Sequence, residues 1–372
     1  MINRRTFSKA VGLGMGAAAV PTGTGTVAAD RSGPPAAVAP AGLSAPAGVF
    51  SPAGLSAPAG VFSPADAPAP ARTFGRLKQV RAGVLDIGYA EAGPAHGPVA
   101  VCLHGWPYDI HSYFDVAPLL AEAGYRVIVP YLRGHGTTTF RSPSEVRNAQ
   151  QSAVALDVVA LLDALGIRRA VLAGFDWGSR TADIVAALWP ERVRALVSVS
   201  GYLVTDVRAQ QNPLPPKAEH TWWYQYYFAT DRGRRALENP QYRRELCRAV
   251  WAEASPTWAF DDATFERTAA AFDNPDHAAI VTHNYRWRLG LAAGEPRYDR
   301  YERRLADRPA IAVPTITLDP GLDPFLASTD GLGYRKFFTG AYEHRVLDGV
   351  GHNAPQEAPV AFARAVLDAD RM

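Results

Sequence analysis

An aspartate occupies the position at which a sharp turn would present a nucleophile. Residues 172–180 read LAGFDWGSR, so Asp176 lies between Gly174 and Gly178, after an apolar run and before a helix-like segment. Glycines two residues before and after a reactive side chain are typical of a tight strand-to-helix turn. A carboxylate is a poor nucleophile toward an amide, but it can attack a strained or activated sp³ carbon. It would open an epoxide or displace a halide, and either reaction leaves an ester on the protein.

Hydrolysis of such an ester needs a base that activates water and donors that bind the oxyanion. The base candidate is His352, in GVGHNAPQEAP after the last apolar run. Its orienting acid should come from TITLDPGLDPF, where Asp323 and Asp319 compete. Asp323 is preferred because it lies farther beyond the predicted strand. The expected oxyanion donors are the backbone N–H groups of Trp177, directly after the nucleophile, and of Trp106 in the HGWP loop.

These motifs resemble those of α/β-hydrolases of the epoxide hydrolase and haloalkane dehalogenase group. The resemblance rests on HGWP (104–107), GFDWG (174–178) and the GVGH histidine, in that order, and covers the chain from Thr73 to its end. It implies an α/β-hydrolase fold, with a mostly parallel central sheet, helices on both faces and a helical cap inserted after the sixth strand. His104 is then expected to hold the oxyanion loop rather than to act as a second base.

The chain departs from the family pattern in one loop. Families of this fold usually have Asp-x-Arg-Gly after the second parallel strand, whereas this chain has Tyr131-Leu132-Arg133-Gly134. That aspartate has mostly a structural role in the family. Its absence therefore affects the expected geometry of this loop rather than the expected chemistry.

The resemblance also implies roles for two cap tyrosines. In epoxide hydrolases two tyrosine hydroxyls bind and protonate the ring oxygen. One lies in a Tyr-Gln context, matched by Tyr224 in WWYQYYF, and the other precedes an arginine, matched by Tyr285 in HNYRWR. Haloalkane dehalogenases instead use two halide donors, often Asn and Trp. Trp177 could be one, but position 106 holds Trp where many of them have Asn, so epoxide opening is favoured.

Two alternatives remain open at this point. A haloalkane or haloacid dehalogenase would use the same aspartate nucleophile. A non-catalytic ligand-binding protein of the same fold would keep the cavity without needing the nucleophile. An ordinary serine esterase is disfavoured, since no Gly-x-Ser-x-Gly occurs between a strand and a helix.

The apolar pattern predicts the elements that position these residues. Almost wholly apolar runs alternate with segments of helical periodicity, which is typical of a parallel sheet covered on both faces. The predicted strands lie within 75–93 (two, antiparallel), 99–105, 125–136, 169–174, 193–201, 311–319 and 343–352. The predicted helices include 113–124, 153–166, one that ends near 188, one after 319 and one that begins at 359.

Between these runs, residues 202–308 are rich in aromatic residues and arginine, with helical spacing and no convincing strand. They would form the cap over the carboxyl ends of the strands, where such folds bind ligands.

The first 72 residues are expected to lie outside the folded part. Paired Arg4 and Arg5, a short apolar stretch and the small residues 27–29 resemble a twin-arginine export signal. Residues 1–29 are therefore predicted to be a signal peptide, and the protein to be periplasmic or extracellular. The apolar stretch is too short and too rich in glycine for a permanent membrane anchor.

Residues 30–72 are predicted to be a disordered linker. They are rich in Pro, Ala and Gly, and the 12-residue segment AGLSAPAGVFSP occurs twice in tandem. The folded part would then consist of a core, 73–201 with 309–372, and the cap, 202–308.

Composition limits the partners. The chain has 38 Lys and Arg against 36 Asp and Glu, with no long charged block, which argues against nucleic-acid binding. Cys102 and Cys247 have no metal-ligand spacing, and the GLGMGA of residues 12–17 lies in the export signal rather than in a βαβ unit. Neither a metal nor an organic cofactor is expected. The expected partners are a small apolar or aryl epoxide and water, and the oligomeric state stays open.

Overall fold

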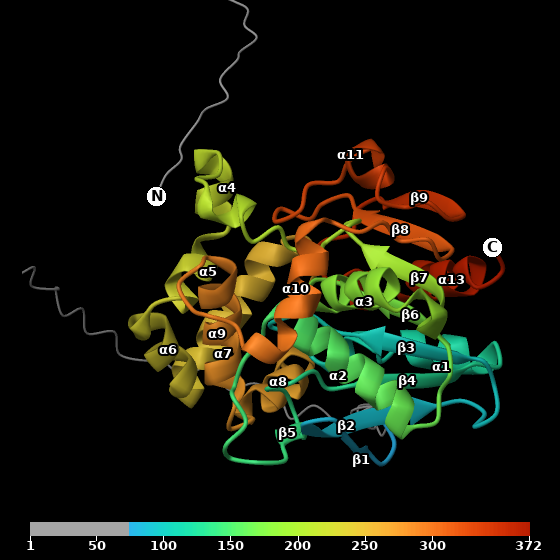
Figure 1. Ribbon diagram of the computed structural model, residues 1–372, viewed down its shortest axis with the longest axis horizontal. Helices are drawn as coiled ribbons and strands as arrows, with labels where there is room; N and C mark the ends of the chain where they lie inside the picture. The colour runs from blue at the N-terminus through green and yellow to red at the C-terminus, as the bar shows by residue number, and fades with distance from the viewer. Residues whose placement is uncertain (1–73) are drawn as a thin grey trace, which may run out of the picture. The chain divides into compact units, whose positions relative to one another are not determined.

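The computed structural model describes residues 74–372, which belong to one compact unit (Figure 1). The export signal and the linker predicted for residues 1–72 lie outside the described residues, so both stay predictions. No helix within residues 74–372 is long and apolar enough to cross a membrane.

A nine-stranded sheet forms the centre of the described chain. Its strands are β1 (Lys78–Ala82), β2 (Leu85–Ala92), β3 (Val99–Leu103), β4 (Arg126–Pro130), β5 (Thr139–Phe140), β6 (Ala170–Gly174), β7 (Val193–Val199), β8 (Thr315–Pro320) and β9 (Tyr342–Leu347). The strand order is β1-β2-β4-β3-β6-β7-β8-β9, with β5 paired to β2. The pairs from β4 through β9 are parallel, and the pairs that involve β2 are antiparallel. The predicted, mostly parallel sheet is confirmed.

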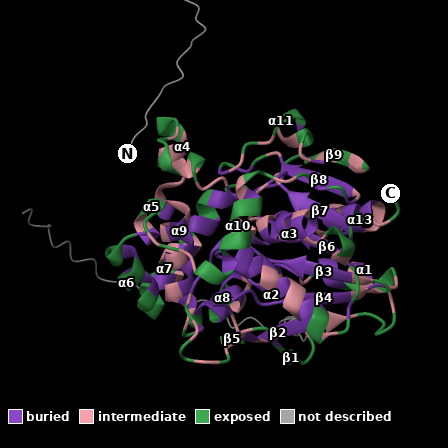
Figure 2. Cartoon of the chain, in the orientation of Figure 1, coloured by how far each residue is buried: buried purple, intermediate pink, exposed green. Residues whose placement is uncertain are grey.

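Helices cover both faces of this sheet (Figure 1). One face carries α1 (Val116–Glu122) and α13 (Pro359–Ala369), and the other carries α2 (Gln151–Ala164) and α3 (Trp177–Leu188). The strands between them are therefore buried on both sides, which explains their unbroken apolar runs (Figure 2). In β6, all five residues are buried.

Short helices complete the core. They are the 3₁₀ turns η2 (Ile110–Tyr113) and η3 (Pro190–Arg192) and the four-residue helices α11 (Leu332–Arg335) and α12 (Ala354–Glu357). The helix predicted over 113–124 is the shorter α1, and η2 precedes it and shares only Tyr113 with the predicted range. The turn begins at Asp109, whose carboxylate accepts the N–H of His111 at 2.9 Å. The helix predicted after residue 319 is only the single turn of α11.

Between β7 and β8 the described chain forms helices and no strand. These are α4 (Pro216–Thr221), α5 (Trp223–Phe228), α6 (Asp231–Glu238), α7 (Pro240–Ala254), α8 (Asp262–Ala269), α9 (His277–Arg288) and α10 (Asp299–Ala306), with the 3₁₀ turns η4 (Ala209–Gln211), η5 (Ala270–Asp273) and η6 (Pro296–Tyr298). We call this segment the helical insertion. Helices α5 to α9 gather beyond the carboxyl ends of the parallel strands (Figure 1).

The insertion follows the seventh strand in chain order, not the sixth as predicted. The difference is β5, a two-residue strand too short to give an apolar pattern. The predicted cap limits, residues 202 and 308, stay a prediction, because core and insertion belong to one compact unit.

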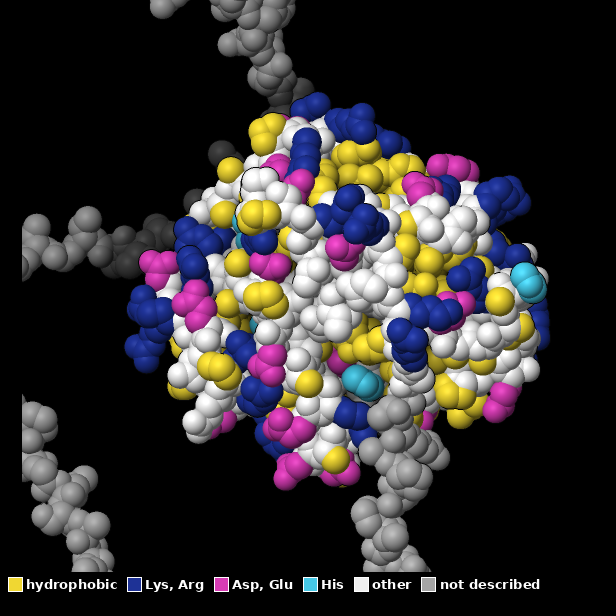
Figure 3. Space-filling view, turned by 90° about the horizontal axis from the view of Figure 1, so that it is seen from below, with side chains coloured by type: hydrophobic (Ala, Val, Ile, Leu, Met, Phe, Trp, Pro, Cys, Tyr) yellow, Lys and Arg dark blue, Asp and Glu magenta, His cyan; other side chains and the backbone are white. Residues whose placement is uncertain are grey.

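The surface carries both signs of charge. On the face shown in Figure 3, Lys and Arg side chains are interspersed with Asp and Glu, and no continuous basic area covers it. This distribution agrees with the small net charge of the chain, +2.

Candidate active site

The turn that presents Asp176 is sterically constrained. β6 ends at Gly174 and α3 begins at Trp177, so the chain reverses around Asp176, which has φ 53° and ψ −121°. A β-carbon on Gly178 would lie 1.8 Å from the carbonyl oxygen of Leu103, and one on Gly174 would lie 2.4 Å from the carbonyl carbon of Gly178. Only glycine fits at both positions. The strained conformation places the Asp176 side chain at the carboxyl edge of the sheet.

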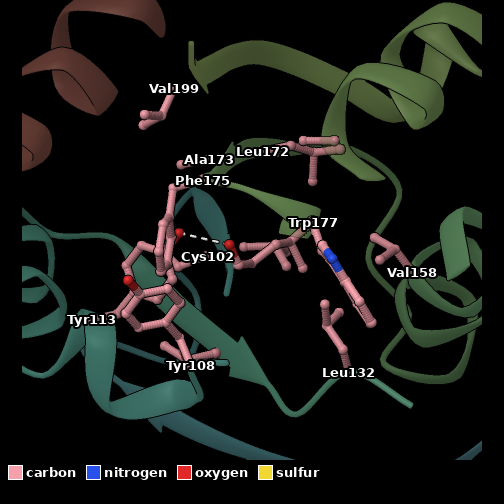
Figure 4. Packing of buried hydrophobic residues seen from close by; sticks show 14 of the residues in the cluster. Cys102, Tyr108, Tyr113, Leu132, Val158, Leu172, Ala173, Phe175, Trp177 and Val199 are labelled. Carbon is pink, nitrogen blue, oxygen red and sulfur yellow. Dashed lines mark hydrogen bonds between the residues drawn. The ribbon is translucent and has the colours of Figure 1, made fainter. Parts of the chain in front are cut away.

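The residues on either side of Asp176 anchor this turn in the core (Figure 4). The ring of Phe175 packs beside Tyr108 and Tyr113, with centroid distances of 5.0 and 6.2 Å. Trp177 lies on the other side of the turn, near Leu132 (Figure 4). Because both neighbours are buried, the direction of the carboxylate between them is fixed by packing.

The imidazole of His352 lies between two carboxylates. Its Nδ1 is 2.7 Å from Oδ2 of Asp323, and its Nε2 is 3.5 Å from Oδ2 of Asp176. Asp319, the competing acid, instead accepts a hydrogen bond from the Tyr334 hydroxyl at 2.7 Å. The structure therefore brings Asp176, His352 and Asp323 together and directs Asp319 elsewhere.

This arrangement shifts the pKa values of both reacting groups. Burial alone would lower the pKa of His352, but the charges and hydrogen bonds of Asp323 and Asp176 raise it to about 10. Burial likewise opposes ionisation of Asp176. The hydrogen bond and charge of His352, followed by the charge of Arg180 and the Trp106 N–H, still hold its pKa below the ordinary aspartate value. The site thus pairs an ionised Asp176 with a protonated His352.

A backbone N–H group of the HGWP loop binds the Asp176 carboxylate. The N–H of Trp106 donates to Oδ1 of Asp176 at 2.8 Å. Trp177 is the first residue of α3, where an N–H has no acceptor within the helix. His104 stabilises the loop that contains Trp106. Its Nδ1 lies 2.8 Å from the carbonyl oxygen of Gly105, and its Nε2 accepts the N–H of Leu132 at 3.1 Å. Burial, followed by the nearby His135, lowers the pKa of His104, so this imidazole is neutral.

Two tyrosines of the insertion lie close to this carboxylate. The rings of Tyr224 on α5 and Tyr285 on α9 contact Trp106 at centroid distances of 6.1 and 5.7 Å. They meet each other edge to face at 6.0 Å. Burial is the largest cause that raises the pKa of each hydroxyl, and the charge of Asp176 adds to it. Both hydroxyls are therefore proton donors at neutral pH.

The insertion helix α7 holds both loops that flank the site. The indole N–H of Trp251 donates to the carbonyl of Pro107 at 2.7 Å, directly after Trp106. The carbonyl of Ala254 accepts the backbone N–H of His352 at 3.1 Å. The insertion therefore positions the core residues as well as supplying the tyrosines.

The loop that departs from the family pattern has its own support. Arg133 donates to both carboxylate oxygens of Asp157, at 2.7 and 2.8 Å, and to two backbone carbonyls. This buried network orders the loop without the usual aspartate, whose position is occupied by the buried ring of Tyr131.

A cavity of about 320 Å³ connects these groups. Asp176, Trp177, Tyr224, Tyr285 and His352 all line it. Three arginines line it as well, Arg180, Arg288 and Arg308, and none of them was predicted from the sequence. For Arg180 and Arg288 a signal was present, because they follow Asp176 and Tyr285 at helical spacings of four and three residues. Within residues 74–372 no cluster of His, Cys, Asp or Glu could hold a metal ion.

Known proteins resemble this chain over most of its described part. The family described as alpha/beta hydrolase fold matches residues 98–354. Epoxide hydrolase A of Mycobacterium tuberculosis is 27% identical over 306 residues, which cover 75% of this chain and 92% of its own. A crystal structure from Klebsiella pneumoniae, provisionally described as an epoxide hydrolase, is 57% identical with a TM-score of 0.79, covering 82% of this chain and 100% of that one. An epoxide hydrolase from Vigna radiata, 20% identical with a TM-score of 0.62 over 79% of this chain and 96% of its own, shares the fold.

Proposed function

The chain belongs to the α/β-hydrolase fold family, and from the geometry of its cavity we propose that it hydrolyses an epoxide to a diol through an ester on Asp176. The observation that carries the proposal is the convergence of Asp176, His352 and two tyrosines, Tyr224 and Tyr285, on one cavity. The tyrosines distinguish this function from others of the fold, because an epoxide oxygen needs a proton as its ring opens. The epoxide hydrolases among the relatives support the same assignment.

Ring opening uses the two oxygens of Asp176 differently. The Trp106 N–H donates to Oδ1, whereas Oδ2 lies 3.5 Å from Nε2 of His352. We assign Oδ2 as the attacking atom. Oδ2 forms a bond to one ring carbon as the carbon–oxygen bond on that carbon breaks. The hydroxyl of Tyr224 or Tyr285 gives its proton to the departing oxygen. The products are a 2-hydroxyalkyl ester of Asp176 and a tyrosinate.

Ester formation converts His352 into a base. It removes the negative charge of Asp176, one of the two carboxylates that raise the pKa of His352. The imidazolium can then return a proton to the tyrosinate. The neutral Nε2 next deprotonates a water that attacks the carboxyl carbon of the ester, while Asp323 stabilises the new imidazolium. The N–H groups of Trp106 and Trp177 bind the oxyanion, and the diol leaves after His352 protonates its alkoxide.

The rings that line the cavity suit an aryl or apolar substituent. Trp222, Phe325 and Trp177 all border it beside the reacting groups. Phe325 contacts the ring of Tyr224 at 5.3 Å and that of His352 at 5.6 Å. An aryl group on the epoxide would pack against these faces.

A single turnover in ¹⁸O-labelled water tests the mechanism. With styrene oxide below the protein concentration, we expect the label in Asp176, detected by peptide mass spectrometry, and an unlabelled diol. Label in the diol with none in Asp176 would indicate direct attack by water and reject the ester. Halide release from a bromoalkane, without diol formation from styrene oxide, would assign the same nucleophile to dehalogenation. A protein that does neither and binds both compounds would be a ligand receptor.

A further inference from the structure

Three arginines border the cavity. The guanidinium of Arg308 lies over the rings of Tyr202 and Phe337. Those of Arg180 and Arg288 lie over no ring within residues 74–372 and donate no hydrogen bond in the mechanism above. Arg180 lies on α3, four residues after Asp176, and Arg288 ends α9, three residues after Tyr285. Side chains three or four residues apart project from the same face of a helix. Each of these two arginines therefore lies about one helical turn from a reacting group and borders the same cavity.

Neither Arg180 nor Arg288 has a hydrogen-bonding partner for its side chain among the described residues. Their side chains form no hydrogen bond or ion pair within residues 74–372, and the Nε atom of each is buried without an acceptor. Arg133 shows the usual alternative for a buried guanidinium, since it is bidentate to Asp157. Both arginines are partly exposed, but their Nε atoms are buried. Polar atoms that are removed from water are ordinarily hydrogen-bonded, because leaving them unpaired is costly. Two guanidinium groups without such partners beside a reaction centre call for a ligand that pairs with them.

The carboxylates that border the cavity do not serve as partners. Asp176 is held by His352 and the Trp106 N–H. Asp206 accepts two backbone N–H groups of its own loop through Oδ1. Burial, and then the positive charge of Arg288, lowers the pKa of Arg180 to about 10. The two like charges therefore act on each other across the cavity.

We propose that the substrate is an epoxide that carries a carboxylate, bound by Arg180 and Arg288. The inference rests on the proposed function and names the substrate class of the same cavity. A planar guanidinium donates in a fork that matches carboxylate geometry. One helical turn, which rises about 5.4 Å, separates Arg180 from Asp176. The carboxylate of the substrate would therefore lie only a few bonds from the epoxide carbon that Asp176 attacks. With the aromatic lining, this describes an aryl-substituted 2,3-epoxy acid.

The two arginines also come from different parts of the chain. Arg180 belongs to the core helix α3, and Arg288 to α9 of the insertion. A carboxylate bound by both would connect core and insertion across the cavity, and it would offset the repulsion between the two guanidinium groups. A neutral epoxide of the same shape would neither connect the two parts nor offset the repulsion. The site should therefore discriminate strongly between an epoxide with a carboxylate and a neutral one.

The test compares an acid with its amide. The substrates are trans-3-phenylglycidate and trans-3-phenylglycidamide, which have similar shapes and differ in charge. For wild type we expect kcat/KM to favour the acid by at least about tenfold. Arg180→Gln and Arg288→Gln should each lower the acid-to-amide ratio by about tenfold or more. Arg286→Gln is the matched control, because it removes the same charge from α9 while its guanidinium contacts the carbonyls of Ala229 and Leu291. Its ratio should match wild type.

A binding measurement separates the failure of this inference from the failure of the proposed function. 3-Phenylpropanoate and 3-phenylpropanamide have no epoxide, so their affinities for wild type, measured by calorimetry, do not depend on turnover. If neutral epoxides are hydrolysed but the acid is neither preferred nor bound more tightly than the amide, the carboxylate inference is wrong and the function stands. If the acid binds through both arginines and no epoxide opens, carboxylate recognition is supported and the epoxide assignment is wrong. Chloride release from 2-chloro-3-phenylpropanoate would then assign the reaction to dehalogenation.

Discussion

The Nδ1 atom of His352 lies 2.7 Å from Oδ2 of Asp323, and the similar carboxylate of Asp319 is bound at the same distance to the hydroxyl of Tyr334. Both aspartates are buried. They come from one short segment at the end of β8, yet only Asp323 can orient the imidazole. Loop geometry, not residue type, assigns the role.

Asp323→Asn should stop the cycle after the ester has formed. The amide cannot stabilise the imidazolium, so ester hydrolysis should slow by about 10³-fold or more. Ring opening needs no base, and the alkylated protein should accumulate with the added mass of one substrate molecule. Intact-protein mass spectrometry during turnover measures it. Asp319→Asn is the matched control and should show no accumulation; equal accumulation in both variants would reject the assignment.

The stability of the protein should fall as pH rises from about 7 to 10, in part because of His352. Its pKa is about 10 in the folded chain, against about 6.5 in an unfolded one. Because the folded pKa is the higher one, this contribution is complete below about pH 6.5 and is lost as pH rises through 10. Urea unfolding at pH 7, 8, 9 and 10 measures it. The difference in unfolding free energy between wild type and His352→Gln should narrow across this range, and a constant difference would contradict the shifted pKa.

The two tyrosine hydroxyls should act in ring opening and not in ester hydrolysis. Tyr224→Phe and Tyr285→Phe should each slow alkylation of Asp176 by about 10- to 100-fold, since one donor remains. The double variant should lose substantially more than either single one. Rapid-mixing tryptophan fluorescence follows the alkylation step. Tyr226→Phe is the control on the same helix, because Tyr226 is exposed and its hydroxyl binds Glu219. Slowing confined to ester hydrolysis would contradict the role of the pair.

The sequence was sufficient for the parallel core because the inner strands of that core are buried on both faces. The runs around 99–103, 170–174 and 193–199 are almost wholly apolar for this reason, and the structure places strands there. The two-residue strand β5 escaped because its pairing with β2 is a tertiary event without a local pattern. The helix predicted over 113–124 is shorter and is preceded by a 3₁₀ turn, which the side chain of Asp109 caps.

The residues of the candidate site likewise fall into those that a local sequence pattern marks and those that only the tertiary structure brings together. Asp176 and His352 were found because flanking glycines and a position after a strand mark them locally. The choice between Asp323 and Asp319 required the path of the loop after β8, which places one carboxylate on the imidazole. The meeting of Arg180 with Arg288 could not be predicted, because it depends on how the insertion lies over the core.

The turn at Asp176 should store backbone strain that glycine would relieve. Its φ of 53° lies in the region that favours glycine, so any other residue there costs about 1–3 kcal/mol. Asp176→Gly and Asp176→Ala both remove the carboxylate and its pairing with His352, so their difference isolates the backbone. We expect the glycine variant to be more stable than the alanine variant by about 1 kcal/mol in urea unfolding. In an unstrained position the order would be reversed, since glycine has the larger conformational entropy to lose.

Gly178→Ala tests the same turn by adding a side-chain atom where the backbone leaves no room for one. Its β-carbon would lie 1.8 Å from the Leu103 carbonyl oxygen, and it should destabilise the protein by about 3 kcal/mol or more. An alanine variant at 176 as stable as the glycine variant would show that the turn is relaxed, and that packing of Phe175 and Trp177 alone directs the nucleophile.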